Sequence, residues 1–415
     1  MRAGIYKVPR GLREFSRRFC TLGHMSDLNK IGSKALYLDY QSTTPVDVSV
    51  LDAMLPFFSE EFGNAHSTSH VYGWSADAAL TVAREQVAAA IGASSDEIIF
   101  TSGATESIHI AILGLLAKEK SAATHIVSVA TEHKATLGAL ERARSDLGAA
   151  VTLLEVDSNG LVDPVSIADA ITEDTSLVSV MGVNNETGVV QPIEKIAKLC
   201  AARNVVFHTD LAQAVGRVPI NVHHSRIGIA SLSAHKIYGP MGIGALFCSK
   251  ALQRRVTPML QGGGQEQGIR SGTVPVPLAV GFGAAASLVS RRRTNEAKRL
   301  AILEGAFLER LRDYVPDTSI NGSTEKRVAG CLNLRFFGVD AEALLGAIPQ
   351  VSVSLGSACT SSAPEPSHVL SAMGLDYESV MGSIRLSFGA PTSLEDALFA
   401  ADHIGQAVKR LRAAA

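Results

Sequence analysis

The sequence lacks several features that would assign it to a specialised class. Its 415 residues hold five cysteines, with no C-x-x-C pair and no Cys/His cluster at zinc spacing: Cys20, Cys200, Cys248, Cys331 and Cys359. An odd number of scattered cysteines predicts neither a disulfide framework nor a metal site. No apolar run approaches the roughly 20 residues of a membrane-spanning helix. We therefore expect no metal and no membrane span.

An excess of charge of one sign is also missing. The chain has 38 basic and 40 acidic residues, giving a net charge of −2 and an isoelectric point of about 6.6. This balance does not indicate a nucleic-acid-binding surface. With 46% hydrophobic and 19% charged residues, the composition favours a well-packed α/β enzyme of two or three domains.

The first 20 residues are an exception, because they contain six basic residues and only one acidic residue, Glu14, with apolar residues between them. A basic, amphipathic, acid-poor leader is typical of a mitochondrial transit peptide. The alternatives are a frayed basic tail, or a start of the protein downstream at Met25. We predict a targeting or disordered leader over residues 1–32 and a mitochondrial location, with the cytoplasm as the alternative.

From about residue 95 the sequence alternates short apolar strands with helix-like segments. Strands are predicted at residues 98–100, 125–129 and 177–181, and two more end at Asp210 and just before Lys236. This alternation predicts a mostly parallel sheet with helices on both faces. Ligands of such sheets bind beyond the carboxyl ends of the strands, where the polar clusters of this chain lie.

A long helix predicted over about residues 276–312 separates this region from the rest. Beyond it the pattern is β-α-β-α-β-α, with strands at residues 331–336, 351–355 and 383–388 and helices at 341–347, 367–373 and 394–412. We predict a large domain over residues 45–290. A smaller α/β domain combines residues 295–415 with residues 33–44.

Lys236 is the most informative residue, in the segment Ser-Ala-His-Lys-Ile-Tyr-Gly-Pro. A lysine just past one strand end and an acid, Asp210, just past another suit pyridoxal 5′-phosphate (PLP) chemistry. The lysine amine forms a Schiff base, and the acid keeps the pyridine nitrogen protonated. Taken alone, Lys236 would be read as a solvated surface lysine.

Residues around Ser102–Ser107 follow a strand and open a helix, so the N–H groups at Ala104 and Thr105 suit a phosphate. An ordinary N-cap turn is the alternative. Ser233 and His235 flank Lys236 and add donors. Three further candidates follow other strands: His133 to stack on the ring and exchange protons, Asn185 to contact cofactor or substrate, and Gln213 to reach the ring hydroxyl. Asn-rich turn chemistry is the alternative for Asn185, and the residues alone do not say which of Asn184 and Asn185 points inward.

Cys359 lies in a small, polar segment punctuated by Gly and Pro, which predicts an accessible loop thiol; an incidental cysteine is the alternative. Arg385 interrupts an apolar strand. It either clamps a substrate carboxylate through its planar fork or pairs with an internal acid. A glycine-rich segment, residues 262–273, is a linker or a loop that reaches a phosphate across a subunit boundary.

Taken together, S-x-H-K-I-Y-G-P, G-S-A-C-T-S and G-G-G-Q-E-x-G-x-R-S-G-T make the chain resemble the cysteine desulfurases. These are fold-type I PLP enzymes of the class-V aminotransferase group, and the resemblance is to their iron–sulfur-assembly and mitochondrial branch. It extends from about Leu38 to Leu411 and implies a large domain with a mostly parallel seven-stranded sheet and a smaller α/β domain.

The resemblance implies a role for each matching residue. Lys236 is the Schiff-base lysine, Cys359 the nucleophile that receives sulfur, and His133 the proton carrier. The remaining cofactor and substrate contacts are Asp210 and Gln213 on the ring, Thr105, Ser233, His235 and the other subunit's Thr273 on the phosphate, and Asn185 and Arg385 on the substrate carboxylate. The implied substrate is L-cysteine, the implied state a homodimer, and the implied sulfur acceptor an iron–sulfur scaffold protein.

Two departures from the family pattern matter. Met241 stands where the family usually has a lysine, and the sequence ends at Ala415, where close relatives continue with a scaffold-docking tail. Scaffold binding is therefore open. A selenocysteine lyase is the alternative enzyme, and a non-catalytic PLP-binding scaffold is the alternative of another class. A kynureninase-like or simple aminotransferase activity leaves Cys359 without a role.

Overall fold

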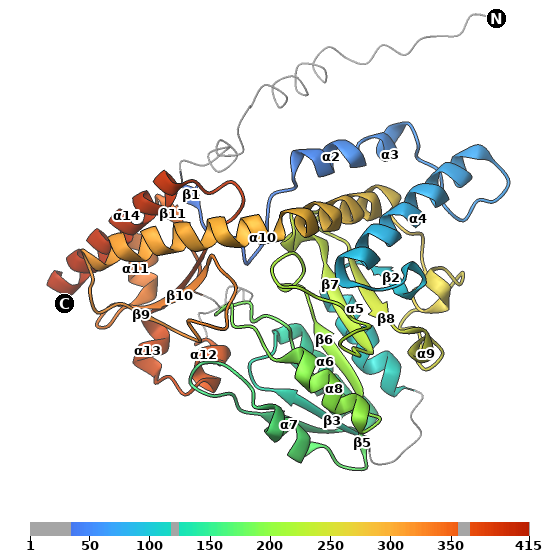
Figure 1. The fold of residues 1–415 in the computed structure, drawn as a ribbon, viewed down its shortest axis with the longest axis horizontal. Helices are drawn as coiled ribbons and strands as arrows, with labels where there is room; N and C mark the ends of the chain where they lie inside the picture. Colours follow the sequence, from blue (N-terminus) through green and yellow to red (C-terminus); the bar gives the residue numbers. More distant parts are fainter. Residues whose placement is uncertain (1–34, 118–123, 356–365, 415) are drawn as a thin grey trace, which may run out of the picture.

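The computed structural model describes residues 35–117, 124–355 and 366–414. Its architecture is α/β, and a central sheet is joined to a smaller C-terminal part by one long helix, α10 (Val276–Arg312), which runs over both (Figure 1). The predicted helix over residues 276–312 is confirmed. No helix in the described part of the chain combines the length and apolar character needed to cross a bilayer.

The central sheet has seven strands in the order β2-β8-β7-β6-β5-β3-β4. Strands β7, β6, β5, β3 and β4 are parallel, and β8 runs antiparallel to both of its neighbours. The predicted, mostly parallel seven-stranded sheet is therefore confirmed. The strands are β2 (Ile98–Thr101), β3 (His125–Val129), β4 (Ala150–Leu154), β5 (Thr175–Ser179), β6 (Val206–Asp210), β7 (Ile229–Ser233) and β8 (Gly244–Cys248).

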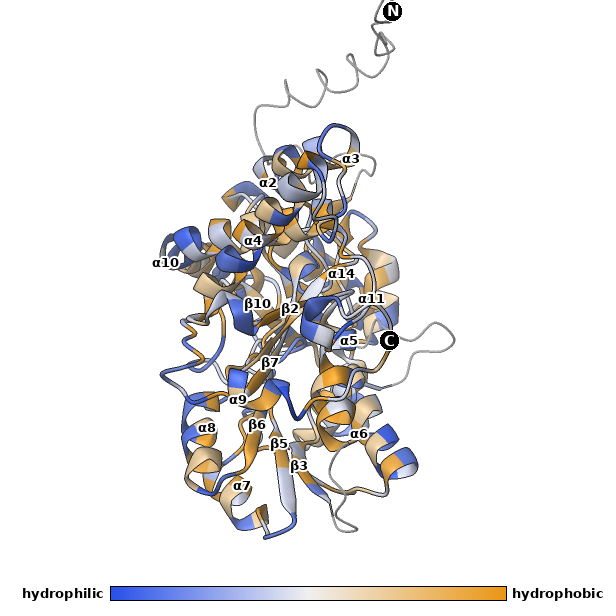
Figure 2. Ribbon diagram, turned by 90° about the vertical axis from the view of Figure 1, so that its right-hand side faces the viewer, coloured by the Kyte–Doolittle hydropathy of each residue, from blue (hydrophilic) through white to orange (hydrophobic). Residues whose placement is uncertain are grey.

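Helices cover both faces of this sheet, because successive strand residues point to opposite sides. In β2, Ile98 and Phe100 join one core, whereas Ile99 joins the core on the other face. The first core includes Leu80 of α4 and the second includes Leu140 of α6. In Figure 2 the central strands carry hydrophobic colour, as strands buried on both faces should. The helices of this part are α2 (Val48–Met54), α3 (Pro56–Ser59), α4 (Val71–Ile91), α5 (Ala104–His109), α6 (Lys134–Leu147), α7 (Pro164–Ala170), α8 (Ile193–Ala202) and α9 (Lys250–Gln253).

The smaller part has its own apolar core and two small sheets. Strand β10 pairs antiparallel with both β12 and β9, and β1 pairs parallel with β11. The sequence reading missed β9 and α13, and the strand predicted over residues 351–355 forms only at its first two residues. The elements are β1 (Leu36–Tyr37), β9 (Ser319–Ile320), β10 (Cys331–Arg335), α11 (Ala341–Ala347), β11 (Val351–Ser352), α12 (His368–Ala372), α13 (Tyr377–Met381), β12 (Ser383–Ser387) and α14 (Leu394–Ala414).

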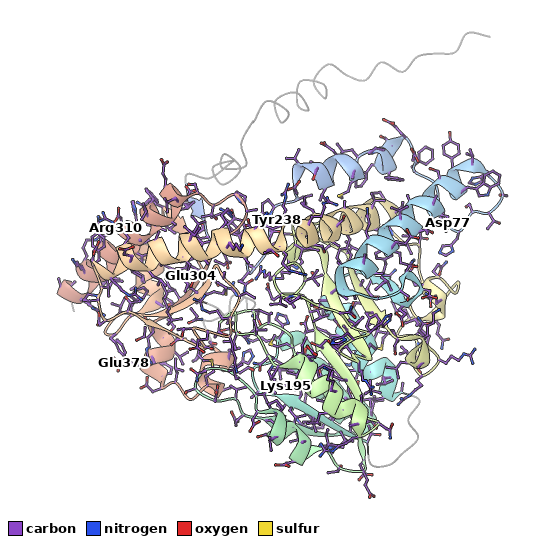
Figure 3. The ribbon with its side chains drawn as sticks, in the orientation of Figure 1. Asp77, Lys195, Tyr238, Glu304, Arg310 and Glu378 are labelled. Atoms are coloured by element: carbon purple, nitrogen blue, oxygen red, sulfur yellow. The ribbon has the colours of Figure 1, made fainter. Side chains whose placement is uncertain are left out.

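Helix α10 is fastened to the smaller part by ion pairs. Glu304 binds the guanidinium of Arg327 and accepts the N–H of Gly330 at 2.9 Å. Arg310, near the C-terminal end of α10, pairs with Asp402 of α14 at 2.5 Å. Figure 3 shows Glu304 and Arg310 along α10, with Tyr238 labelled near the middle of the helix. The domain limits proposed from the sequence stay a prediction.

Candidate active site

A cavity of about 470 Å³ lies among the loops that follow the strands of the central sheet. Ten residues singled out from the sequence line it: Ala104, Thr105, His133, Asn185, Asp210, Gln213, Ser233, His235, Lys236 and Arg385. Thr273 is exposed and is not part of its lining in this chain. Cys359 lies outside the described residues. The fold thus brings together side chains that are up to 281 residues apart between Ala104 and Arg385.

Lys236 reaches the cavity from a short 3₁₀ turn, Ala234–Lys236, directly after β7. Its Nζ donates to the main-chain carbonyls of Gln41 at 3.0 Å and Ser42 at 2.5 Å. Both acceptors belong to the segment that follows β1. Carbonyl acceptors hold the ammonium in place without neutralising it with a carboxylate.

Asp210 ends β6 and is almost fully buried. Burial raises the pKa of Asp210 to about 6, although a hydrogen bond from Ala212 N–H at 2.8 Å and the charge of Lys236 oppose the shift. One turn on, Gln213 donates to the carbonyl of Gln41 at 2.8 Å, and its Oε1 is buried without a partner among the described residues. The site therefore presents a carboxylate and an unused amide oxygen three residues apart in sequence.

His133 is the N-cap of α6, where its Nδ1 accepts the N–H of Ala135 at 3.1 Å. A ring nitrogen that accepts carries no proton, so the proton of the neutral ring is on Nε2. Burial lowers the pKa of His133 to about 4, and the positive charge of Lys236 lowers it further. His133 is therefore neutral at pH 7 and can exchange a proton at Nε2.

Glu132, the residue before His133, was not predicted. It is fully buried, its Oε1 accepts the N–H of Met181 at 2.6 Å, and its Oε2 has no partner within the described residues. Burial raises the pKa of Glu132 to about 8, against the hydrogen bond from Met181, and the nearby Asp210 adds to the rise. A neutral carboxyl group therefore lies behind the histidine at pH 7.

The first turn of α5 forms another wall of the cavity. The N–H groups at the start of a helix have no acceptor within that helix, so those at Ala104 and Thr105 are available to a ligand. Glu106, in the same turn, accepts from Ser102 N–H at 2.5 Å and from Arg270 Nε at 3.0 Å. Burial raises the pKa of Glu106, but these two donors outweigh it and the net shift is downward.

Arg385 lies on β12 of the smaller part and is buried, and its side chain lines the cavity together with residues that follow the strands of the central sheet. Its Nη2 pairs with Asp39 at 2.6 Å, so the alternative of an internal acid is realised in this structure. Its Nη1 donates to the carbonyl of Asn185 at 3.0 Å, and its Nε has no partner among the described residues. The Asn185 Oδ1 is also buried without a partner there.

The segment after β1 is the main part of the site that the sequence reading left without a role. Gln41 and Ser42 accept from Lys236, and Thr43 Oγ1 lies 3.0 Å from His235 Nδ1. The polar run Q-S-T-T directly after a strand was the available signal. In the described ranges no three His, Cys, Asp or Glu side chains gather as metal ligands.

The class-V aminotransferase model matches residues 36–398. The mitochondrial cysteine desulfurase of Drosophila melanogaster is 48% identical over 379 residues, covering 91% of this chain and 82% of that protein. The cysteine desulfurase IscS of Rickettsia typhi is 46% identical over 377 residues, covering 91% and 92%.

Solved structures agree with these relatives. A NifS-like protein superposes with a TM-score of 0.84 at 31% identity, covering 90% of this chain and 99% of its own. A structure described as SspA in complex with cysteine has a TM-score of 0.76 at 35% identity, covering 85% and 98%. The chain therefore belongs to the class-V aminotransferase family, and the two relatives compared by sequence are named cysteine desulfurases.

Proposed function

We propose that this chain is an L-cysteine desulfurase, which releases L-alanine and retains the sulfur as a persulfide on Cys359. The observation that carries the proposal is the cavity in which Lys236, Asp210, His133 and Arg385 meet. Each of these groups suits one requirement of amino-acid chemistry on PLP. The names of the relatives support the same reaction.

PLP fits the donors and acceptors of this cavity. Asp210 is a buried carboxyl group whose pKa is raised by burial, a shift that the charge of Lys236 opposes, so a protonated ring nitrogen would supply a further counter-charge. Gln213 Oε1 is a buried acceptor with no partner among the described residues, suited to a ring hydroxyl. The helix start at Ala104 and Thr105, with Ser233 and His235, would hold the phosphate.

Bound PLP would withdraw electrons from the α-carbon of an amino acid joined to it. Lys236 would hold the cofactor covalently through its amine. His133, neutral with its proton on Nε2, would move protons at the substrate, with its protonation governed by burial and by the charge of Lys236.

Arg385 and Asn185 would bind the substrate carboxylate. Arg385 has an unused buried Nε, and its partner Asp39 stops the guanidinium from carrying an uncompensated charge before substrate arrives. A planar guanidinium matches a carboxylate through two parallel hydrogen bonds. The amide of Asn185 would add a third polar contact.

Cys359 would carry out the sulfur transfer. Its thiolate attacks the substrate sulfur, a sulfur–sulfur bond forms, and the substrate carbon–sulfur bond breaks. The electron pair of that bond stays with the substrate carbon, which takes up a proton and leaves as L-alanine. The structure does not describe Cys359, so this role rests on the sequence motif and on the family.

Product analysis tests the proposal. Purified protein with PLP, L-cysteine and a thiol reductant should give alanine and sulfide in equal amounts, and Lys236→Ala should give neither and lose the visible cofactor absorbance. Lys198→Ala, on the exposed face of α8, should behave as wild type. Release of selenide from selenocysteine without turnover of L-cysteine would favour the lyase, and a coloured protein inert to both would favour a scaffold.

We further propose a homodimer in which Thr273 serves the partner's phosphate site, since Thr273 is exposed and outside this chain's own cavity. Native mass spectrometry checks it, and a monomer with full activity would refute it. The sulfur acceptor we propose is an iron–sulfur scaffold protein. The location we propose is the mitochondrion, supported by the name of the Drosophila relative, a mitochondrial cysteine desulfurase. Import of the full chain into isolated mitochondria tests the location.

A further inference from the structure

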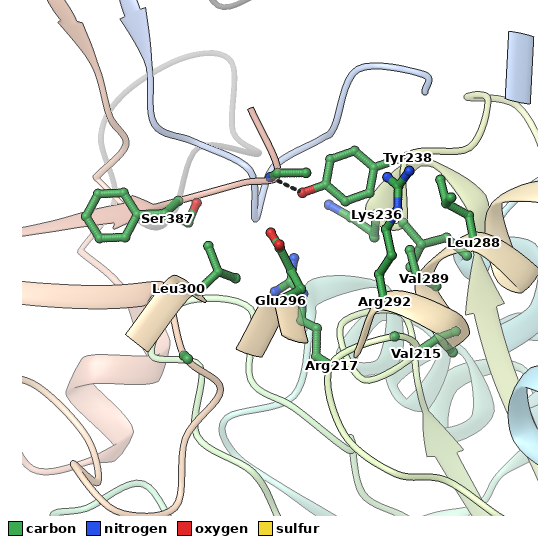
Figure 4. Close-up of a pocket in the computed structure, with 16 residues that line it drawn as sticks. Val215, Arg217, Lys236, Tyr238, Leu288, Val289, Arg292, Glu296, Leu300 and Ser387 are labelled. Carbon is green, nitrogen blue, oxygen red and sulfur yellow. Dashed lines mark hydrogen bonds between the residues drawn. The ribbon is translucent and has the colours of Figure 1, made fainter. Parts of the chain in front are cut away.

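A second cavity, of about 260 Å³, lies next to the candidate active site. The two cavities share Lys236 and no other described lining residue. One face of α10 forms a wall through Leu288, Arg292, Glu296 and Leu300, which follow one another at helical spacing (Figure 4). None of the proposed catalytic steps uses this second cavity.

Most of the surface of the second cavity is apolar. Val215, Leu288, Val289, Leu300 and Phe388 contribute aliphatic and aromatic walls. A dry cavity of about 150 Å³ is enough to hold benzene. The second cavity therefore has room for a chain or ring of about six carbon atoms together with a polar head.

The charged side chains that line the second cavity differ in whether an opposite charge compensates them. Glu296 is neutralised by Arg299, which binds it through two hydrogen bonds of 2.9 and 2.8 Å. Arg292 lies 3.4 Å from the carboxylate of Asp47. Arg217 has no carboxylate within salt-bridge distance in the described part of the chain, where it donates a hydrogen bond to the side-chain oxygen of Gln41.

A guanidinium inside a largely apolar cavity is costly unless an anion compensates it. Burial lowers the pKa of Arg217, in keeping with that cost, although the group stays charged. The hydroxyl of Tyr238 accepts the N–H of Ala390 at 2.7 Å, and its own proton has no acceptor among the described residues. Arg217 and Tyr238 can thus donate together to one anionic head group.

We propose that the second cavity binds a small monocarboxylate with an apolar tail. The carboxylate pairs with Arg217 and accepts from Tyr238, and the tail lies against Leu288 and Val289 of α10. A planar guanidinium binds a carboxylate through two parallel N–H donors. A site made of an inorganic cation has no such donors.

Gln41 connects this second cavity to the active-site cavity. Its side-chain oxygen accepts from Arg217, while its main-chain carbonyl accepts from Lys236 Nζ at 3.0 Å and from Gln213 Nε2 at 2.8 Å. A carboxylate that draws Arg217 away from Gln41 removes one of the contacts that hold Gln41 in place. Gln41 therefore links Arg217 of the second cavity to Lys236, which itself lines both cavities.

The test is calorimetric titration of the cofactor-loaded protein with sodium hexanoate, with 1-hexanol as the uncharged analogue. Wild type should bind one equivalent of hexanoate. Arg217→Met should weaken binding at least tenfold, and Ala390→Leu, which adds bulk to the lining of the cavity, should weaken it as much. Arg142→Met, an exposed arginine on α6, should bind as wild type. Hexanol should bind at least tenfold more weakly than hexanoate.

Three results would overturn the proposal. Wild type with no saturable binding up to tens of millimolar would remove the site. Unchanged affinity in both Arg217→Met and Ala390→Leu would place the ligand elsewhere. Affinity lost in Arg385→Met but kept in Arg217→Met would assign hexanoate to the active site. Because each result is read from binding, it stands apart from whether the protein turns over L-cysteine.

Discussion

Replacing Glu132 by glutamine should change how the stability of the protein depends on pH. The wild-type carboxyl is fully buried and has a pKa of about 8 in the folded protein against an ordinary value of 4.5. Between pH 4.5 and about 8, the folded state therefore keeps a proton that the unfolded chain has lost. Stability from this group is fully present below pH 4.5 and is lost as pH rises through 8.

The magnitude follows from one proton. A difference of one bound proton changes the free energy of unfolding by about 1.4 kcal/mol per pH unit. Between pH 6.0 and 7.5, which lies inside the window, wild type should lose about 2 kcal/mol more stability than Glu132→Gln. Glutamine keeps the shape and the acceptor for Met181 but does not titrate, so contributions from other groups cancel in the comparison.

Urea unfolding at a series of pH values, at matched cofactor occupancy, measures this difference. Glu141→Gln is the control, because Glu141 is an exposed acid on α6 paired with Arg144, and it should follow wild type throughout. Parallel curves for wild type and Glu132→Gln between pH 6.0 and 7.5 would show that Glu132 is already ionised in the folded protein, and the reasoning from burial would be wrong.

Two other substitutions test the Arg84–Glu266 ion pair and the proposed binding of the substrate carboxylate by Arg385. Glu266→Gln should cost about 3 kcal/mol in unfolding experiments, because it removes the carboxylate charge that binds Arg84 at 2.6 Å and leaves one acceptor oxygen fewer for Arg84 and Phe100 N–H. A loss below about 1 kcal/mol, as for a surface pair, would contradict this expectation. Arg385→Lys should raise KM for L-cysteine at least tenfold in steady-state assays, since lysine cannot bind a carboxylate through two parallel donors; an unchanged KM would reject Arg385 as the clamp.

The sequence reached the strand-end residues because a parallel sheet gathers the carboxyl ends of its strands. Asp210 ends β6 and Lys236 follows the adjacent strand β7, so residues predicted at strand ends do lie at the same edge of the sheet. Gln41 could not be found this way, since it acts through a main-chain carbonyl on a lysine 195 residues away. Its contact depends on how the segment after β1 lies against the sheet.

The smaller part was harder to predict for the same reason. Strand β9 has only two residues and exists because β10 pairs with it, so it has no periodicity to read. The pairing of Arg385 with Asp39 joins residues 346 positions apart, and the sequence could only pose it as one of two alternatives. Glu132 was missed because its neighbours in sequence do not reveal that it is fully buried.

The central claim is that Cys359 receives the sulfur of L-cysteine. Intact-protein mass spectrometry of cofactor-loaded wild type after brief exposure to L-cysteine, without reductant, tests it most directly. The account predicts one added sulfur atom located by peptide mapping to Cys359, and none in Cys359→Ala, which keeps its cofactor absorbance. Sulfur on another cysteine, or alanine production undiminished in Cys359→Ala, would contradict it.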